Sequence, residues 1–177
     1  DSLLDPVVMI QTEDGVGSGF FIQADGLLLT NNHVIDGATE ISVLTRQGPS
    51  FRGTVVGIDE SRDLALVKID ANNMPTLSLS ATSSGFVGQD VMVIGSPLGL
   101  EWSVSKGIVS SIRSNDGVTF LQTDAAMNHG NSGGPLIHLT TRTVLGINTL
   151  KLDESSAYGI GFAVSADEVR KAFPNLR

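Results

Sequence analysis

The stretch Asn128-His129-Gly130-Asn131-Ser132-Gly133-Gly134-Pro135-Leu136 sets a serine among glycines on a sharp turn that leads into an apolar strand. A serine hydroxyl is a weak nucleophile at neutral pH, so a catalytic serine needs an adjacent base, an orienting carboxylate and backbone N–H groups for the oxyanion. Glycine has no Cβ and lets a substrate carbonyl approach the N–H groups of Gly130 and Ser132. Asn and Gly also form ordinary turns, so this stretch alone leaves a purely structural turn open.

The first half of the sequence offers a candidate base and a candidate carboxylate. His33 follows the strand-like run Leu27-Leu28-Leu29-Thr30, and the end of a strand is a place from which a base can be aimed. Asp63 directly precedes the apolar run 64–69, where a partly desolvated carboxylate needs a donor such as a histidine Nδ1–H. Each residue alone has a structural alternative, His33 as a satisfied structural histidine and Asp63 as a turn residue paired with Arg62.

The three candidates occur in the order His33, Asp63, Ser132. This is the chain order of chymotrypsin-like proteases, whereas subtilisins and α/β-hydrolases arrange the same three residue types differently. The order therefore favours the chymotrypsin-like fold, with His33 and Asp63 in the first half and Ser132 in the second, across a cleft.

Short apolar runs bounded by Gly, Asn, Asp or Pro recur along the chain, which is typical of an all-β protein. Ser165-Ala166-Asp167-Glu168 has the capping-box pattern and predicts a short terminal helix that Pro174 ends. We expect one trypsin-like domain over 1–177, with a first barrel at about 1–75, a second at about 85–164 and a helix at about 166–173. The predicted strands include residues 7–10, 20–22, 41–44, 54–58, 91–94, 108–112, 144–147 and 160–164.

Seven short sequence blocks are spread along nearly the whole chain. They are Gly17-Ser18-Gly19-Phe20, Thr30-Asn31-Asn32-His33-Val34, Asp63-Leu64-Ala65-Leu66, Ile94-Gly95-Ser96-Pro97-Leu98-Gly99, Thr123-Asp124-Ala125-Ala126, 130–136 and Gly159-Ile160-Gly161-Phe162-Ala163. Together they closely resemble the protease domain of the HtrA (Deg) family. The resemblance implies an ATP-independent serine endopeptidase with two perpendicular six-stranded β-barrels, acting on unfolded or exposed polypeptide in protein quality control or regulated proteolysis.

The resemblance also implies roles for individual residues. His33, Asp63 and Ser132 would form the catalytic triad, with an oxyanion hole at Gly130, Asn131 and Ser132. The residue six positions before the nucleophile lies at the floor of the P1 pocket in this fold, and here it is an alanine with no carboxylate to attract Lys or Arg. We therefore expect small or medium aliphatic P1 residues. By the same resemblance Met127 and Leu150 would line this pocket, unless they are plain core residues, and 147–149 would pair with the substrate backbone as an added strand. The predicted substrate-binding residues are thus Ala126, Met127, Ile147, Asn148, Thr149 and Leu150.

Composition narrows the choice of partners. The net charge of −8, with 11 Lys and Arg residues, argues against nucleic-acid binding. The sequence contains no cysteine, and its three histidines lack the HExxH spacing of zinc proteases, so we expect no metal and no cofactor. The resemblance implies a non-cytosolic compartment, such as the bacterial periplasm, the cell envelope or an organelle lumen, with anchoring through a segment outside this sequence left open.

Two further expectations concern assembly and activity. The family resemblance suggests a homotrimer, and a PDZ domain or a regulatory peptide that this sequence does not contain. The alternative function is a latent or non-catalytic family member that binds unfolded polypeptides or partners while its oxyanion loop is collapsed.

Overall fold

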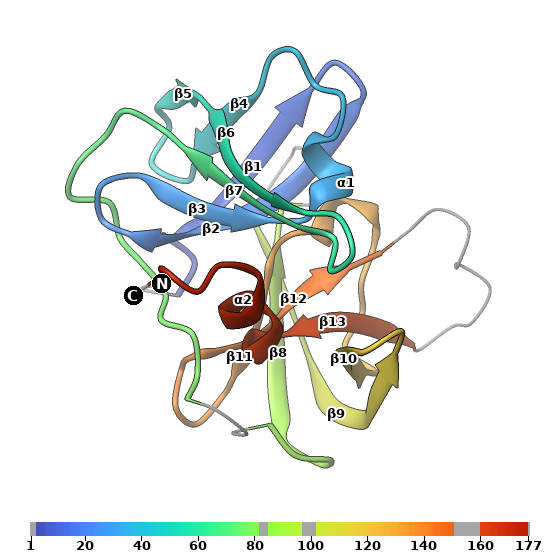
Figure 1. Ribbon diagram of the computed structural model, residues 1–177. Helices are drawn as coiled ribbons and strands as arrows, with labels where there is room; N and C mark the ends of the chain where they lie inside the picture. The colour runs from blue at the N-terminus through green and yellow to red at the C-terminus, as the bar shows by residue number, and fades with distance from the viewer. Residues whose placement is uncertain (1–2, 82–84, 97–101, 151–159, 177) are drawn as a thin grey trace.

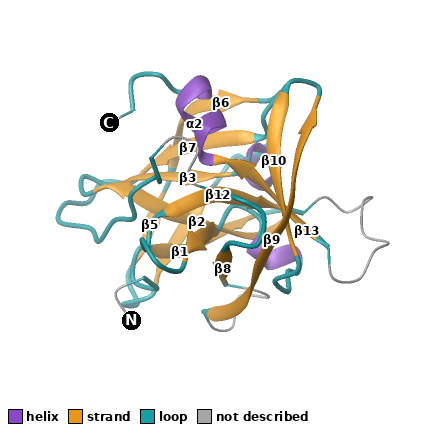
Figure 2. Cartoon of the chain, turned by 90° about the horizontal axis from the view of Figure 1, so that it is seen from below, coloured by secondary structure: helices purple, strands orange, loops and turns teal. Residues whose placement is uncertain are grey.

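The computed structural model describes residues 3–81, 85–96, 102–150 and 160–176. In this part of the chain, strands form two β-sheets, and the helices are short (Figures 1 and 2). The first sheet is formed by residues before Ile69 and lies above the second in Figure 1. The all-β, chymotrypsin-like fold class that the sequence predicts is thereby confirmed.

The first sheet has seven strands in the order β5-β4-β1-β2-β3-β7-β6. The sequence predicts six strands in a barrel, and the difference arises at Gly53, which divides one extended segment in two. The part before Gly53 pairs with β4, and the part after it pairs with β7 at the opposite edge. The strands are β1 (Val7–Thr12), β2 (Gly15–Gln23), β3 (Leu27–Thr30), β4 (Ser42–Thr45), β5 (Ser50–Arg52), β6 (Thr54–Asp59) and β7 (Leu64–Lys68).

The second sheet is a closed six-stranded barrel in the order β10-β13-β12-β11-β8-β9. Because the barrel is closed, each of its strands is hydrogen-bonded on both sides, including β12, which lies next to the turn of the candidate nucleophile. The strands are β8 (Asp90–Gly95), β9 (Ser103–Asn115), β10 (Val118–Thr123), β11 (Pro135–His138), β12 (Val144–Thr149) and β13 (Gly161–Ser165).

The described residues form two α-helices, α1 (Asn32–Ile35) and α2 (Ala166–Ala172). Helix α2 is the predicted terminal helix, and the Ser165 side chain caps it by accepting a hydrogen bond from the Asp167 N–H. The capping-box pattern also predicts that Glu168 bonds back to this end of the helix. It does not, because its carboxylate has charged partners elsewhere in the fold.

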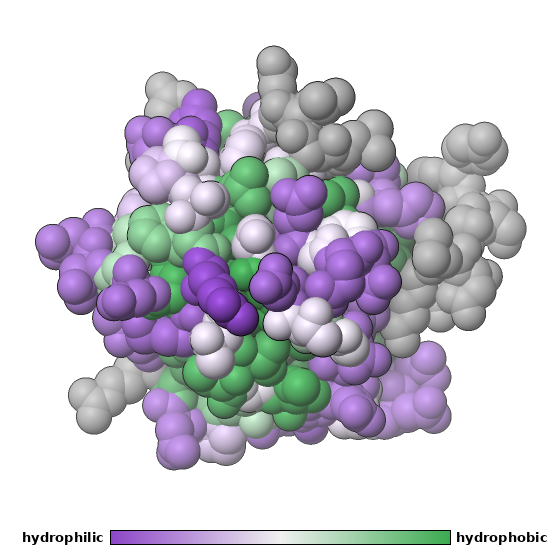
Figure 3. All heavy atoms as spheres, turned by 90° about the horizontal axis from the view of Figure 1, so that it is seen from above, coloured by the Kyte–Doolittle hydropathy of each residue, from purple (hydrophilic) through white to green (hydrophobic). Residues whose placement is uncertain are grey.

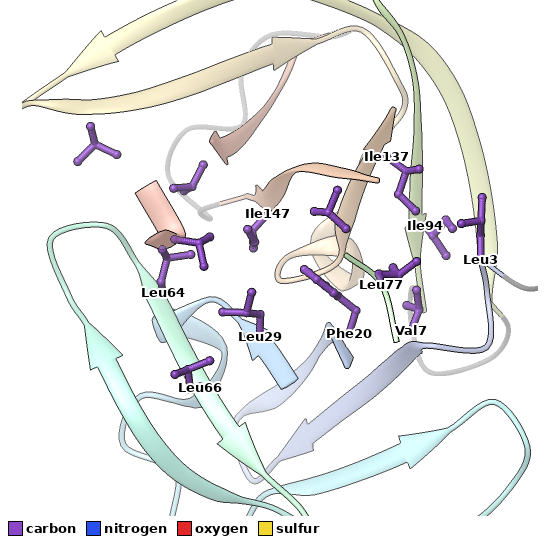
Figure 4. Packing of buried hydrophobic residues seen from close by; sticks show 14 residues of the cluster. Leu3, Val7, Phe20, Leu29, Leu64, Leu66, Leu77, Ile94, Ile137 and Ile147 are labelled. Carbon is purple, nitrogen blue, oxygen red and sulfur yellow. The ribbon is translucent and has the colours of Figure 1, made fainter. Parts of the chain in front are cut away.

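A single hydrophobic cluster joins the two sheets. Phe20 and Leu29 of the first sheet pack in the same cluster as Ile94, Ile137 and Ile147 of the second (Figure 4). All five side chains are fully buried. This shared core fixes the first sheet against the barrel and so determines which loops meet at the boundary between them.

The surface is mixed in polarity. Seen from above, hydrophobic side chains reach the surface between hydrophilic ones (Figure 3). Val56 and Ile58 of the edge strand β6 are among the exposed apolar residues. None of the helices in the described ranges is long and apolar enough to cross a membrane.

Candidate active site

His33 and Asp63 meet because β3 and β7 are hydrogen-bonded neighbours. Thr30 at the end of β3 lies opposite Ala65 near the start of β7, so the residues just beyond them are adjacent. His33 Nδ1 lies 2.6 Å from Asp63 Oδ2, and the His33 backbone N–H donates to Asp63 Oδ1 at 2.8 Å. The carboxylate thus holds both the imidazole and the backbone of the residue that carries it.

Asp63 adopts an unusual backbone conformation, with φ of +56°. Its carbonyl oxygen accepts from the backbone N–H of Asn32 at 3.1 Å and from the side-chain amide of Asn31 at 3.0 Å. Such left-handed conformations are uncommon for residues other than glycine and persist where surrounding contacts enforce them. Asp63 is not paired with its neighbour Arg62, the purely structural role that the sequence left open. The Arg62 guanidinium instead bonds Asp59 and Glu168.

The second sheet adds one contact to this pair. Thr149 Oγ1, at the end of β12, donates to Asp63 Oδ2 at 3.2 Å. The Asp63 side chain is 13% exposed and that of His33 is 33% exposed, so the base is accessible while the carboxylate is shielded. A cavity of about 630 Å³ opens beside Asp63 and Thr149, with Phe120 and Phe162 in its lining.

The loop that carries Ser132 is a 3₁₀ turn, His129–Asn131, closed on itself. The Ser132 N–H points to the His129 carbonyl oxygen at 3.5 Å, and the Asn131 N–H donates to the Asn128 carbonyl at 2.9 Å. An oxyanion hole requires such N–H groups to face the position of the substrate oxygen. In this arrangement the Ser132 N–H is directed at its own chain, and the role of Gly130, Asn131 and Ser132 as an oxyanion hole stays a prediction.

The loop is anchored to the first sheet through Ser18 of β2. The Ser18 hydroxyl donates to the Gly130 carbonyl at 2.6 Å, and the Ser18 N–H donates to the Ser132 carbonyl at 2.8 Å. The next residue, Gly133, has φ of +89°, and a Cβ there would overlap the Ser18 carbonyl oxygen. The turn therefore requires glycine at this position.

The Ser132 hydroxyl forms two hydrogen bonds with the backbone of Leu150. Ser132 Oγ donates to the Leu150 carbonyl at 3.0 Å and accepts from the Leu150 N–H at 3.0 Å. Among the described residues it has no hydrogen bond to His33. The structure thus brings His33 and Asp63 together and places Ser132 on a neighbouring loop, with the hydroxyl engaged by backbone rather than by the imidazole.

Comparison with known proteins places the chain in a family. The family model that describes the trypsin-like peptidase domain matches residues 17–147 of this chain. The chain belongs to the trypsin-like peptidase family. It is 44% identical over 92% of its length to a probable periplasmic DegP-like serine endoprotease of Halomonas elongata, and 38% identical over 93% to the putative serine protease HhoB of Synechocystis. These homologues confirm the HtrA/Deg resemblance.

A solved structure has the same architecture. The serine endoprotease from Yersinia pestis superposes with a TM-score of 0.84 at 36% identity, over 98% of this chain and 63% of that one. The chain spans only 35% of the Halomonas relative and 41% of HhoB. The similarity therefore concerns the peptidase domain and not the remaining parts of those proteins.

The residues predicted to bind substrate lie in two places, on β12 and in the segment between β10 and the Ser132 turn. Ile147 lies between Pro135 of β11 and Val164 of β13. The Asn148 N–H donates to the Gly134 carbonyl, and the Asn148 carbonyl accepts from Gly133. The backbone of Ile147 and Asn148 is thus engaged within the barrel. The pairing of 147–149 with a substrate strand stays a prediction.

The predicted P1-pocket residues Ala126 and Met127 lie between β10 and the nucleophile turn. Ala126 is exposed, and its carbonyl accepts from Ser105 Oγ at 2.7 Å. Met127 is half-buried and packs so closely on Gly161 that a Cβ there would overlap its sulfur. Their role in specificity stays a prediction. The blocks Pro97-Leu98-Gly99 and Gly159 lie outside the described residues.

Sequence reasoning missed two contributions to the site. Thr149 was predicted to bind substrate, but its side chain bonds Asp63. Ser18 received no role, although its hydroxyl fixes the Gly130 carbonyl. Ser18 lies in one of the blocks that carry the family resemblance, and Thr149 directly precedes Leu150. The sequence therefore drew attention to both stretches, but it did not indicate which atoms would meet.

Proposed function

We propose that this chain is the catalytic domain of a serine endopeptidase that uses His33, Asp63 and Ser132. The observation that carries the proposal is the short Nδ1–Oδ2 contact of 2.6 Å between His33 and Asp63, reinforced by the His33 N–H and by Thr149. A largely shielded carboxylate bonded to Nδ1 fixes the imidazole tautomer in which Nε2 is free to accept a proton. The family membership and the glycine-rich serine turn support the same function.

In the proposed reaction, Ser132 Oγ attacks the scissile peptide carbonyl while His33 Nε2 takes its proton. Asp63 holds the imidazolium that forms, and the N–H groups of Gly130 and Ser132, with Asn131 completing the turn, stabilise the oxyanion. His33 then passes the proton to the leaving amine. Water, deprotonated by His33, hydrolyses the acyl-enzyme and restores the Ser132 hydroxyl.

This reaction requires two movements from the arrangement described above. The Ser132 hydroxyl has to leave the Leu150 backbone, and the Ser132 N–H has to leave the His129 carbonyl. A substrate strand that pairs with Thr149 and Leu150 supplies a reason for the first movement, because it would compete for the Leu150 backbone that holds the hydroxyl. The scissile carbonyl oxygen supplies a reason for the second, because it offers the Ser132 N–H a new acceptor. Substrate binding and assembly of the site are therefore coupled in this proposal.

The substrates we propose are unfolded or exposed polypeptides, cut after small or medium aliphatic residues in quality control or regulated proteolysis. The support is the absence of a carboxylate at Ala126 and the half-buried Met127 beside it. Relatives named as periplasmic support a non-cytosolic location. A homotrimer, a PDZ domain and a regulatory peptide remain proposals carried by the family resemblance alone.

The test is to map by mass spectrometry the fragments of denatured casein produced by the wild-type chain and by Ser132→Ala. A matched control is Ser42→Ala, which removes the hydroxyl of an exposed serine on β4. We expect cuts after Val, Ile, Ala or Leu with the wild type and the control, and none with Ser132→Ala. Cuts that persist in Ser132→Ala would contradict the assignment of the nucleophile, and cuts after Lys or Arg would contradict the pocket.

The second candidate is a latent member that binds polypeptide without cutting it. The closed 3₁₀ turn and the Leu150 contacts to Ser132 Oγ favour it as the resting form. Casein that binds the wild-type chain but stays intact, with cuts appearing after addition of a hydrophobic peptide, would support a latent enzyme. Binding with no cuts under any addition would support a non-catalytic role.

A further inference from the structure

Glu168 of helix α2 is a buried carboxylate that the proposed reaction does not use. Its side chain is 1% exposed, although acidic residues in the first turn of a surface helix usually face water. Oε1 accepts from Arg62 Nε at 2.9 Å, and Oε2 accepts from the backbone N–H of Thr119 at 3.1 Å. Lys171, one turn further along the helix, lies 3.4 Å from Oε2.

Arg62 is the residue immediately before Asp63, and it joins α2 to the turn that holds the candidate catalytic carboxylate. Its Nη1 donates to Asp59 Oδ2 at 2.9 Å, while its backbone N–H donates to Asp59 Oδ1 at 3.0 Å. One guanidinium therefore bridges a carboxylate of its own turn and the carboxylate of α2. The planar fork of arginine suits this double contact, which a lysine ammonium cannot reproduce with the same geometry.

The network connects the two sheets at the candidate site. Arg62 lies in the β6–β7 turn of the first sheet and Asp59 at the end of β6, whereas Thr119 belongs to β10 of the barrel and Glu168 to α2. The adjacent Asp63 has φ of +56° and needs surrounding contacts to keep that conformation. From this turn Asp63 contacts both His33 of the first sheet and Thr149 of β12.

The charges of the network are mutually stabilised. Burial alone would raise the pKa of the Glu168 carboxyl, but hydrogen bonds from Arg62 and Thr119 and the charge of Lys171 outweigh burial and hold that pKa below its ordinary value. The hydrogen bond from Arg62 to Glu168 in turn raises the pKa of the guanidinium. Loss of Arg62 would leave the buried Glu168 carboxylate with only the Thr119 N–H and the more distant Lys171, whereas loss of Glu168 would leave Arg62 paired with Asp59 alone.

We propose that Arg62 and Glu168 are positioning residues that set the orientation of Asp63, and through it of His33, across the boundary between the two sheets. The inference rests on the proposed function, in which Asp63 orients His33. Neither residue touches the reacting atoms. The pair acts by fixing the turn in which Asp63 holds its left-handed conformation against Asn32, His33 and Thr149.

The experiment compares Glu168→Gln with Asp167→Asn. Both replace a carboxylate by its amide at neighbouring positions of α2, but Asp167 pairs with Arg170 on the helix surface and has no contact with the β6–β7 turn. Two readouts are taken below the unfolding temperature of each variant. The first is kcat and KM for an aliphatic-P1 peptide, and the second is the far-downfield proton signal of His33 Nδ1–H in the NMR spectrum.

We expect Glu168→Gln to lower kcat on the order of tenfold or more with KM within about twofold, because the binding residues stay in place while the base is misaligned. The His33 Nδ1–H signal should shift or broaden. Asp167→Asn should leave kcat and the signal as in the wild type. Arg62→Lys, which keeps the charge but not the double contact, should fall between the wild type and Arg62→Met.

A purely structural role gives a different pattern. If Glu168→Gln lowers the unfolding temperature but leaves kcat and the His33 signal unchanged, the proposal is overturned. If Glu168→Gln does not fold, Arg62→Lys carries the same test, because it retains a cation beside the buried carboxylate. Failure of the proposed function would appear as absence of turnover in the wild type, while the NMR signal still reports whether the pair positions His33.

Discussion

The two halves of the candidate site are built in different ways. On one side, Asp63 and His33 are joined by two direct hydrogen bonds, and Asp63 has further contacts to Asn32 and Thr149. On the other side, the Ser132 loop directs its N–H groups at its own carbonyls, and the hydroxyl bonds Leu150. The His33–Asp63 pair has the geometry that the proposed general base needs. The Ser132 turn does not have the geometry that the proposed nucleophile needs.

The difference follows from how each side is held. His33 and Asp63 lie at the ends of neighbouring strands, β3 and β7, so the register of one sheet brings them together. Ser132 lies on a turn between the barrel and β2, where the direction of its N–H groups depends on a few local bonds such as those to Asn128 and His129. Strand register is fixed by many hydrogen bonds, whereas a single peptide orientation is set by few.

The largest expected effect comes from a substitution in the His33–Asp63 pair. Asp63→Asn should lower kcat by about 10⁴-fold, because the amide favours the wrong imidazole tautomer and cannot stabilise the imidazolium. Steady-state kinetics on an aliphatic-P1 peptide measures this. Asp70→Asn, an exposed aspartate beyond the other end of β7, is the control and should retain the wild-type kcat. Comparable losses in both variants would remove Asp63 from the proposed role.

The next effect concerns the turn that carries the nucleophile. Gly133→Ala should destabilise the fold by about 3 kcal/mol, because φ is +89° and the new methyl would overlap Ser18 and Thr30. Gly117→Ala has a similar φ of +80° but open space around it, and should cost only about 1 kcal/mol. Urea unfolding measures both, and equal losses would show that the crowding at Gly133 is relieved without cost.

A smaller effect tests the contact between the two sides. Thr149→Val keeps the shape of the side chain but removes the hydrogen bond to Asp63, and should lower kcat about tenfold. The control is Thr39→Val, which removes a comparable threonine–carboxylate bond to the exposed Glu13. An unchanged kcat in Thr149→Val would mean that Asp63 is oriented by the first sheet alone.

The smallest effect depends on pH. Because the folded state holds the pKa of Glu168 below its ordinary value of 4.5, ionised Glu168 stabilises the fold above that value, and this contribution is lost as the pH falls through the lowered pKa. Urea unfolding of the wild type should therefore show stability decreasing on acidification below about pH 4.5. Glu168→Gln should show a shallower decrease, and an identical pH dependence would contradict a stabilising charge at Glu168.

The sequence predicted the meeting of His33 and Asp63 correctly because strand ends are marked by apolar runs and by turn residues. It did not predict the left-handed conformation of Asp63, which arises from contacts with Asn31 and Asn32 rather than from the residue itself. The strand pattern likewise did not reveal that Gly53 divides one extended segment between two edges of the sheet. Tertiary pairing decided both features.

Glu168 illustrates a local pattern that tertiary structure overrides. Its position after Ser165 fits a capping box, but Arg62 lies 106 residues away in sequence and supplies a charged partner. A charge-assisted bond outweighs a local bond to a backbone N–H that water can also satisfy. For the Ser132 turn the sequence left both the open and the collapsed state as alternatives, because the same glycine-rich residues permit both peptide orientations.

The most direct measurement of the central claim is a pair of crystal structures, of the free chain and of its adduct with a peptide boronic acid that has valine at P1. The account predicts that free Ser132 Oγ bonds Leu150 and its N–H faces His129. In the adduct, Oγ should be bonded to boron, with Gly130 and Ser132 N–H groups on a boronate oxygen. Boron on another residue, or a free structure with Ser132 Oγ already on His33 Nε2, would contradict it.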